Sequence, residues 1–375
     1  MDFSLPVNPI KILMLFISIS FISICLDKAG FFSMCASKAL NKAKGSNLLF
    51  FILLYLTVSI LTIFTSNDIV VLTFTPFICY YTAIKKTNPL PYLFIEFIAA
   101  NSWSMMLEIG NPTNIYLALS ANISFIEYFK IMFLPTFISC LSSFFLVIFI
   151  FRKSIFSYKK DNLEQKISNF QYSIDKNMII VSLIHLIICL FGLIFFSDYM
   201  YIVCLICAIS LSLFMIINDI IHKTKISIEV YKKLPYAMIP FILSMYIIVC
   251  SLNNANVTDI IANGLNTLAI NDLTTALTYG YTSIISCNIL NNIPMSILYS
   301  SILANNNNII AIYATIIGSN LGALLTPIGA LAGIMWLSIL KNQNIKISFT
   351  SFTKYCGVIC FFTALIAFIT LAIVI

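Results

Sequence analysis

Charged residues are scarce in this chain: only 9% of its 375 positions are Asp, Glu, Lys or Arg, whereas 60% are hydrophobic. A soluble domain of this size does not need so much apolar surface. Runs of about 18 or more apolar residues indicate helices that cross a hydrocarbon core about 30 Å thick. Because backbone groups in lipid must be satisfied within the protein, such runs are helical. The scarcity of charge therefore predicts an all-α polytopic membrane protein, with the lipid bilayer as its partner.

Histidines and clustered carboxylates are also scarce, which argues against an enzyme. His185 and His222 have no neighbouring ligand or catalytic partner in the sequence, so they predict neither a catalytic pair nor a metal site. The cysteines are scattered singly, except that Cys204 and Cys207 have CxxC spacing without the second pair of a zinc site. The sequence has no P-loop, so ATP hydrolysis by this chain is not expected. We expect no cofactor and no metal.

The net charge of +7 comes mostly from lysines in short loops between apolar runs. This placement is the usual bias of cytoplasmic loops, so the charge predicts membrane topology and no nucleic-acid partner. The first apolar run, 10–26, lacks both a preceding basic cluster and a nearby small-residue cleavage site. It is therefore expected to be a retained helix and not a signal peptide.

One long polar stretch, 152–177, divides the chain into a first repeat, 1–151, and a second repeat, 178–375. Residues 5–30 resemble 234–256, and the SNDIV motif at 66–70 falls on LNNIP at 290–294 at nearly the same offset. Two polar interruptions matched at nearly the same offset favour an internal repeat.

Lysine placement predicts how the two halves enter the membrane. Segment 46–84 has lysines on both flanks, whereas 272–304 has none on either side. The first segment is therefore expected to enter and return from the cytoplasmic face, and the second from the external face. About eight other segments then cross fully, both termini lie outside, and the two halves form the inverted repeat of secondary transporters. The expected spans are 9–26, 91–121, 131–151, 178–197, 199–217, 236–252, 308–340 and 349–375.

Four polar interruptions occur at matched places in the two halves: 65–69, 110–114, 287–294 and 318–329. Proline ends or kinks a helix, and an opened helix frees backbone groups that need a partner. The new helix N-terminus presents N–H donors and partial positive charge to an anion or a polar solute. We therefore expect a solute site where these interruptions meet. A simple kink or a surface turn is the alternative for any one of them.

Two carboxylates lie at these interruptions. A carboxylate at membrane depth is costly and marks a candidate functional site. Asn292 is the counterpart of Asp68 in the paired motif, and a single carboxylate across the pair favours coupling to a proton or cation. A carboxylate that caps the following half-helix is the alternative. Glu108 is either a coupling residue or a structural partner for a freed amide. Glu96 is expected near the membrane surface and solvated.

At these motifs the chain resembles the arsenical pump membrane protein (arsenite efflux) family. This family belongs to an ion transporter superfamily that includes citrate carriers, dicarboxylate/sodium symporters and some sodium/proton antiporters. The resemblance covers essentially the whole chain and is carried by 26–45, 65–78, 109–115, 291–303 and 317–341, of which the last, IGSNLGALLTPIGALAGIMWLSILK, is the most specific.

The resemblance implies two re-entrant hairpins that meet two broken helices at a midplane site and move together in an elevator-like manner. The implied substrate-binding residues are Asn67, Asp68, Gly110, Asn111, Pro112, Thr113, Asn114, Asn291, Asn292, Gly318, Ser319, Asn320, Thr326 and Pro327. Family members usually carry further N-terminal helices that serve scaffold and dimer contacts, which leaves a homodimer open. The hairpin motif Ser66-Asn67-Asp68 also differs from the Ser-Asn-Thr of the sodium/dicarboxylate branch.

The leading hypothesis is a secondary transporter of the plasma membrane that exports arsenite, antimonite or a similar small oxyanion in exchange for protons. A carrier of citrate, dicarboxylate or another small inorganic or organic anion, coupled to sodium or protons, is the alternative. A sodium/proton antiporter comes third. None of the four interruptions contains Arg or Lys, which favours a weakly charged solute. A passive channel would also use polar pore residues, but paired inverted interruptions suit alternating access better.

Overall fold

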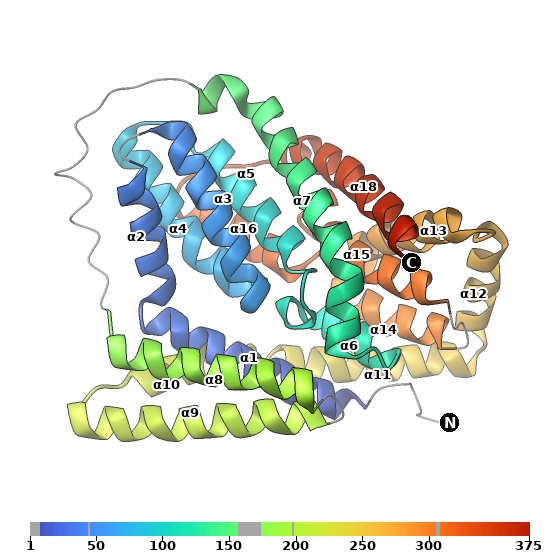
Figure 1. Ribbon diagram of the computed structural model, residues 1–375, viewed down its shortest axis with the longest axis horizontal. Coiled ribbons are helices and arrows are strands. Elements are labelled where there is room, and N and C mark those ends of the chain that lie inside the picture. The colour runs from blue at the N-terminus through green and yellow to red at the C-terminus, as the bar shows by residue number, and fades with distance from the viewer. Residues whose placement is uncertain (1–7, 44–45, 157–173, 197–198, 305–307) are drawn as a thin grey trace.

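The computed structural model describes residues 8–43, 46–156, 174–196, 199–304 and 308–375, and every regular element in them is helical (Figure 1). Most of the linker predicted at 152–177 lies outside the described residues. The membrane character and the all-α class predicted from composition are confirmed.

One group of helices forms a layer along one side of the molecule, the lower edge of Figure 1. In this layer α1 contacts α8, α9, α10 and α11. Its members are α1 (Pro9–Lys28), α8 (Lys176–Phe195), α9 (Met200–His222), α10 (Ile226–Lys233) and α11 (Met238–Asn254). We call this group the scaffold layer.

The remaining helices form a bundle above the scaffold layer, and they come from both halves of the chain. The first half contributes α2 (Phe31–Lys42), α3 (Asn47–Phe64), α4 (Asn67–Lys85), α5 (Leu90–Trp103), the 3-10 turn η1 (Glu108–Gly110), α6 (Pro112–Ser120) and α7 (Phe125–Ile155). The second half contributes α12 (Val257–Leu268), α13 (Asp272–Leu290), α14 (Asn292–Leu303), α15 (Ile309–Leu325), α16 (Leu331–Asn342), α17 (Phe349–Phe352), the π turn η4 (Thr353–Gly357) and α18 (Val358–Val374).

The order of elements from α1 to α7 recurs from α11 to α18: a long helix, a short helix, a hairpin, an interrupted helix and a long helix. The two series are joined in the bundle by contacts of α7 with α18, of α4 with α16, and of α6 with α14 and α15. Helices α8, α9 and α10 stand between the two series along the chain.

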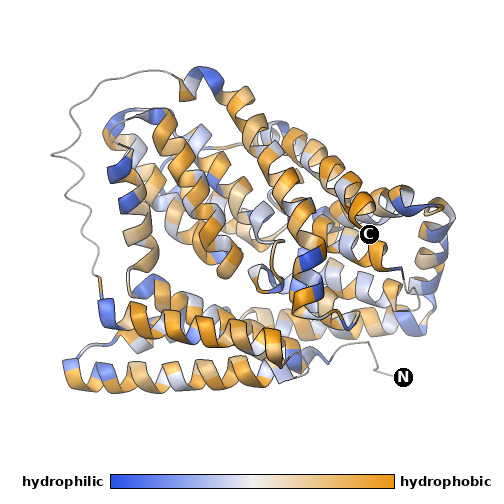
Figure 2. Cartoon of the chain, in the orientation of Figure 1, coloured by the Kyte–Doolittle hydropathy of each residue, from blue (hydrophilic) through white to orange (hydrophobic). Residues whose placement is uncertain are grey.

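Helix boundaries follow the caps that the sequence supplies. Asn8, Ser46 and Ser124 are N-cap residues whose side chains accept a backbone N–H of the first turn of α1, α3 and α7. At α13, Asn271 and Thr274 form a reciprocal capping box. Such side chains satisfy donors that the helix leaves without a partner. Figure 2 shows polar residues gathered at these ends and hydrophobic residues along the long helices.

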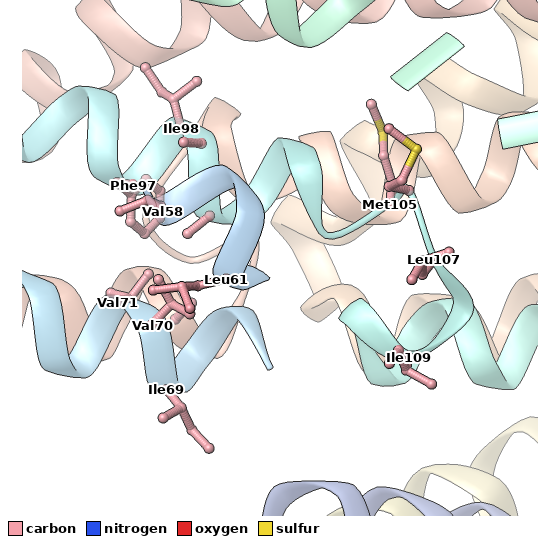
Figure 3. Packing of buried hydrophobic residues seen from close by; sticks show 14 of the residues in the cluster. Val58, Leu61, Ile69, Val70, Val71, Phe97, Ile98, Met105, Leu107 and Ile109 are labelled. Atoms are coloured by element: carbon pink, nitrogen blue, oxygen red, sulfur yellow. The ribbon is translucent and has the colours of Figure 1, made fainter. Parts of the chain in front are cut away.

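Apolar side chains hold the first hairpin against the interrupted helix beside it. Val58 and Leu61 of α3, Val70 of α4 and Phe97 of α5 are buried and belong to one cluster (Figure 3). In lipid such contacts stabilise by close packing more than by exclusion of water. The packing fixes the end of the hairpin, where the predicted polar motif lies.

Eight helices in the described residues are long and apolar enough to cross a membrane, the number expected from the sequence. The eight helices are not the eight spans predicted, however. Both arms of the first hairpin, Asn47–Phe64 and Asn67–Lys85, qualify, whereas the predicted spans 91–121 and 308–340 do not because each is divided into shorter helices. The interruptions predicted in those two segments are thus present.

The positions of the interruptions are shifted from those predicted. The interruption predicted at 110–114 lies at 104–111, and Pro112, Thr113 and Asn114 already form the first turn of α6. The interruption predicted at 318–329 is confined to 326–330, because Gly318, Ser319 and Asn320 continue the helix α15. Proline accounts for the first shift, since its fixed φ and missing N–H suit the first position of a helix.

Candidate functional site

A cavity of about 440 Å³ lies between the scaffold layer and the bundle. On the scaffold side it is lined by Phe16, Ser20, Ile24 and Asp27 of α1 and by Lys233, Pro235 and Met238 at the α10–α11 junction. On the bundle side it is lined by Ser66, Asp68, Ile69, Leu72, Thr73, Asn111, Pro112, Asn292, Ile293, Ala330, Leu331, Met335 and Ile339. We call it the central cavity.

Four helix N-termini meet at the central cavity. The N-cap or first-turn residues of α4, α6, α14 and α16 all contribute to its lining. The N-caps of α4, α14 and α16 make no side-chain capping hydrogen bond. Their first N–H groups therefore remain available as donors, and each helix adds partial positive charge at this end. The arrangement suits a solute rich in oxygen atoms.

The first hairpin brings Asp68 to the cavity wall. Asp68 is half-buried in the first turn of α4, and no hydrogen bond to its side chain occurs among the described residues. Its neighbour Asn67 is 2% exposed and donates from Nδ2 to Asn101 Oδ1 at 3.2 Å. Asn67 therefore fixes the hairpin end to α5, while Asp68 remains free to face a solute.

Asn320 joins the two interrupted helices behind the cavity. Its Oδ1 accepts from Asn111 Nδ2 at 3.0 Å and from the Ser104 hydroxyl at 2.9 Å, and its Nδ2 donates to Asn114 Oδ1 at 2.6 Å. Beside it, the hydroxyls of Thr113 and Ser319 are 2.9 Å apart. These side chains are at most 2% exposed. Because buried amides are costly unless bonded, this network holds the interruptions in one geometry.

The second hairpin and the second interruption are also joined by side-chain amides. Asn291 Nδ2 donates to the carbonyl of Ile328 at 3.2 Å, and the Thr326 hydroxyl donates to Asn288 Oδ1 at 2.5 Å. Asn292 is 5% exposed, starts α14 and lines the central cavity. The carbonyl of Ile328, which lies in the interruption, thus finds a partner within the protein.

The expectation that Glu96 is solvated is wrong. Glu96 is 0% exposed, and its carboxylate accepts from the Thr75 hydroxyl and from Trp336 Nε1, both at 3.2 Å. It connects α5 with α4 and α16. Only the fold reveals this, because the partners are far apart in the sequence.

Glu108 is 0% exposed, and neither of its carboxylate oxygens has a hydrogen-bond partner among the described residues. It does not line the central cavity. It is the first residue of η1, within the interruption at 104–111. The hypothesis of a structural partner for a freed amide therefore finds no support in this conformation.

The chain matches a known protein family and individual relatives. The profile described as "Arsenical pump membrane protein" matches residues 8–375. This chain belongs to the arsenical pump membrane protein family.

Individual relatives agree with this assignment. The arsenical pump membrane protein of Escherichia coli (strain K12) is 26% identical over 368 residues, covering 95% of this chain and 84% of that protein. The arsenical pump membrane protein of Yersinia enterocolitica is 27% identical over 369 residues, with the same coverage of 95% and 84%.

Among solved structures, the YdaH transporter of Alcanivorax borkumensis, whose topology its title describes as unusual, matches with a TM-score of 0.62. The match covers 96% of this chain and 84% of that one, at 13% sequence identity. At this identity the similarity concerns the fold alone.

The predicted site residues of this family member fall into two groups. Asp68, Asn111, Pro112 and Asn292 line the central cavity. The others stand behind it or hold the elements in place: Asn67, Gly110, Thr113, Asn114, Asn291, Gly318, Ser319, Asn320, Thr326 and Pro327. Substrate contact by any of them stays a prediction.

A carboxylate, a hydroxyl and an ammonium group of the cavity wall were not expected from the sequence. Asp27, Thr73 and Lys233 line it together, although Asp27 and Lys233 are more than 200 positions apart in the chain. Asp27 and Lys233 lie near the ends of apolar segments, where a charge is ordinary, and Thr73 lies within α4, where a hydroxyl is equally ordinary. Only their convergence in the fold makes them candidates.

Proposed function

We propose that the protein is a secondary active transporter of the plasma membrane that exports arsenite or antimonite in exchange for protons. The observation that carries the proposal is the meeting of four helix N-termini and the carboxylate of Asp68 at one cavity. Membership in the arsenical pump membrane protein family supports an arsenical as the transported solute.

The solute is held, in this proposal, by hydrogen bonds and not by a cationic clamp. Backbone N–H groups at the starts of α4, α14 and α16 act as donors, and the amides of Asn111 and Asn292 act as donors or acceptors. Neutral arsenous acid carries hydroxyl groups that fit both roles. Asn320 and Asn114, which do not line the cavity, position Asn111 from behind.

Proton coupling is assigned to two carboxylates. Asp68 lies in the cavity wall, where solute and proton can compete for the same place. Burying a charged carboxylate without a partner is costly, so Glu108, with both oxygens unbonded, is a second candidate to carry a proton. Exchange follows if the site releases the proton as the solute binds.

The proposed topology has the hairpins α3–α4 and α13–α14 entering from opposite faces of the membrane, with both termini external. The short helices that precede them support this, because α2 and α12 stand at opposite ends of the scaffold layer (Figure 1). The lysine asymmetry around 46–84 and 272–304 agrees. In this proposal the repeats 1–151 and 178–375 are inverted through their matching series, α1–α7 and α11–α18, and the bundle moves past the scaffold in an elevator-like manner.

A citrate or dicarboxylate carrier is the alternative within the same fold. Uptake into inverted membrane vesicles, measured for arsenite, antimonite, citrate, succinate and sodium with and without an imposed pH gradient, separates the two. Arsenite accumulation that collapses with a protonophore is expected. Accumulation of citrate or succinate without arsenite transport would contradict the proposal. Labelling of single cysteines flanking 46–84 and 272–304 with an impermeant thiol reagent tests the topology, in a background without the native cysteines.

A further inference from the structure

Asp27, Thr73 and Lys233 meet in the wall of the central cavity, at the junction of α1, α4 and α10. Lys233 Nζ lies 3.0 Å from Asp27 Oδ2, and the Thr73 hydroxyl lies 2.7 Å from Asp27 Oδ1. Both oxygens of Asp27 are therefore engaged, one by the scaffold layer and one by the first hairpin. All three residues line the cavity.

The position of Lys233 is fixed from the other end of α10. Asp219, near the end of α9, accepts the backbone N–H groups of Ile226 and Ser227 at 3.0 and 2.8 Å. A second ion pair, between Lys28 and Glu229, joins the same two elements as the pair of Asp27 and Lys233. Helix α10 is thus held at both ends, and these contacts fix Lys233 in the cavity wall.

The charges around the cavity give this pair a specific consequence. Among the described residues that line it, the charged ones are Asp27, Asp68 and Lys233. Because Asp27 neutralises Lys233, the remaining full charge is that of Asp68. Besides the partial positive charge of the helix N-termini, an anion entering the cavity meets the carboxylate of Asp68 and no uncompensated cation. A neutral hydroxyl-rich solute can use the same N–H donors without being repelled by that carboxylate.

We propose that Asp27 and Lys233 form a charge filter that selects neutral hydroxyl-bearing solutes over anions in the central cavity. The proposal rests on the transport function proposed above for the identity of its solute, arsenous or antimonous acid. The roles of the two residues are opposite. Lys233 would attract anions by itself, and Asp27 suppresses this attraction while keeping its hydrogen bond to Thr73.

The test measures how citrate and phosphate inhibit arsenite uptake into inverted vesicles. Asp27→Asn preserves an acceptor for Thr73 but frees the charge of Lys233. The concentration of citrate for half inhibition is expected to fall about fivefold, a modest change because Lys233 is half exposed to solvent. Lys233→Gln is expected to move it in the opposite direction, and Asp27→Asn/Lys233→Gln to return near the parent. Lys232→Gln, outside the cavity lining, is the matched control.

A second measurement keeps the filter testable apart from transport. Stabilisation of the purified protein against thermal unfolding by citrate or phosphate reports anion binding directly. Asp27→Asn should increase this stabilisation, less so at high salt because exposed charges are screened, and Lys233→Gln should decrease it.

Absence of arsenite transport in the parent protein would overturn the proposed function but leave this measurement standing. If Asp27→Asn does not fold, Lys233→Gln decides alone. Anion affinity unchanged in the folded single variants, or a gain that persists in the double variant, overturns the filter.

Discussion

The hairpins α3–α4 and α13–α14 present the same backbone feature to the central cavity but different chemistry. Each second arm begins with an asparagine, Asn67 in α4 and Asn292 in α14, and each N-terminus contributes to the lining. Next to that asparagine the first hairpin places a carboxylate, Asp68, and the second places Ile293. Of the two hairpin ends, only the first thus carries a carboxylate, and in the proposed mechanism this is the group that couples transport to a proton.

The two hairpins also turn by different means. The first turns through Thr65 and Ser66, both at negative φ. The second turns through Asn291 alone, at φ 81° and ψ 156°, a region that glycine adopts freely and other residues adopt at a cost. The shorter connection stores strain at the solute-facing end of the second hairpin, and Asn291 offsets part of it through its bond to Ile328.

Packing against the neighbouring helix differs as well. In the second half a methyl group added at Gly318 of α15 would lie 1.9 Å from the Ser283 hydroxyl of α13 and 2.7 Å from the carbonyl oxygen of Gly280. In the first half the corresponding helices are α3 and α5, and the Thr62 hydroxyl of α3 donates to the carbonyl of Ala100 in α5 at 2.9 Å. The second hairpin therefore approaches its neighbour closely enough to require glycine.

The largest effect is expected from a substitution that removes the charge difference between the hairpins. Asp68→Asn removes the carboxylate that distinguishes the first hairpin from the second, and pH-driven arsenite transport should fall about tenfold or more, because a charged hydrogen-bonding group contributes about 1.5–3 kcal/mol. The rate of uptake into inverted vesicles under a fixed pH gradient measures this. Asp259→Asn, on the exposed face of α12, should leave the rate unchanged. Full gradient-driven transport by Asp68→Asn would remove the coupling role.

The next effect tests the close approach in the second half. Gly318→Ala should destabilise the protein by about 1–3 kcal/mol, because backbone at Gly280 cannot yield to the added methyl group as a flexible side chain could. Thermal unfolding of the purified protein in detergent shows the loss as a lower midpoint.

Gly264→Ala is the matched control, because nothing lies within 4 Å of the added group and the position is inside α12. It should stabilise by about 0.5–1 kcal/mol. Equal midpoints for the two alanine variants would mean that α13 and α15 are not in the close contact described.

A smaller effect is expected from substitutions that compare the backbone strain of the two hairpin turns. At position 291 glycine should be more stable than alanine by about 1–2 kcal/mol, because alanine keeps the strained backbone without the side-chain bond. At Ser66, where φ is −68°, glycine should be no better than alanine. Unfolding midpoints of the four variants give both differences, and the same preference at both positions would show that the turns do not differ in strain.

Local properties of the sequence were enough for the class of protein and the approximate place of each interruption. Runs of apolar residues predicted the helices, and the asparagine motifs at 65–69 and 287–294 predicted the hairpin ends. The sequence did not predict that the interruption expected at 318–329 is confined to 326–330. Gly318, Ser319 and Asn320 are small or polar, yet they remain helical through contacts with Ser283 and Asn114. Local propensity alone cannot account for such tertiary support.

By itself, the sequence determined that this protein is a helical membrane protein whose helices open at four polar motifs, because hydropathy and proline act over a few neighbouring residues. The tertiary structure decided which of those motif residues reach the central cavity and which lie behind it. It also decided that Asp27, Thr73 and Lys233 meet, and that Glu96 is buried against Trp336. Contacts between distant segments depend on how whole helices pack, and a pattern of local propensities does not contain that information.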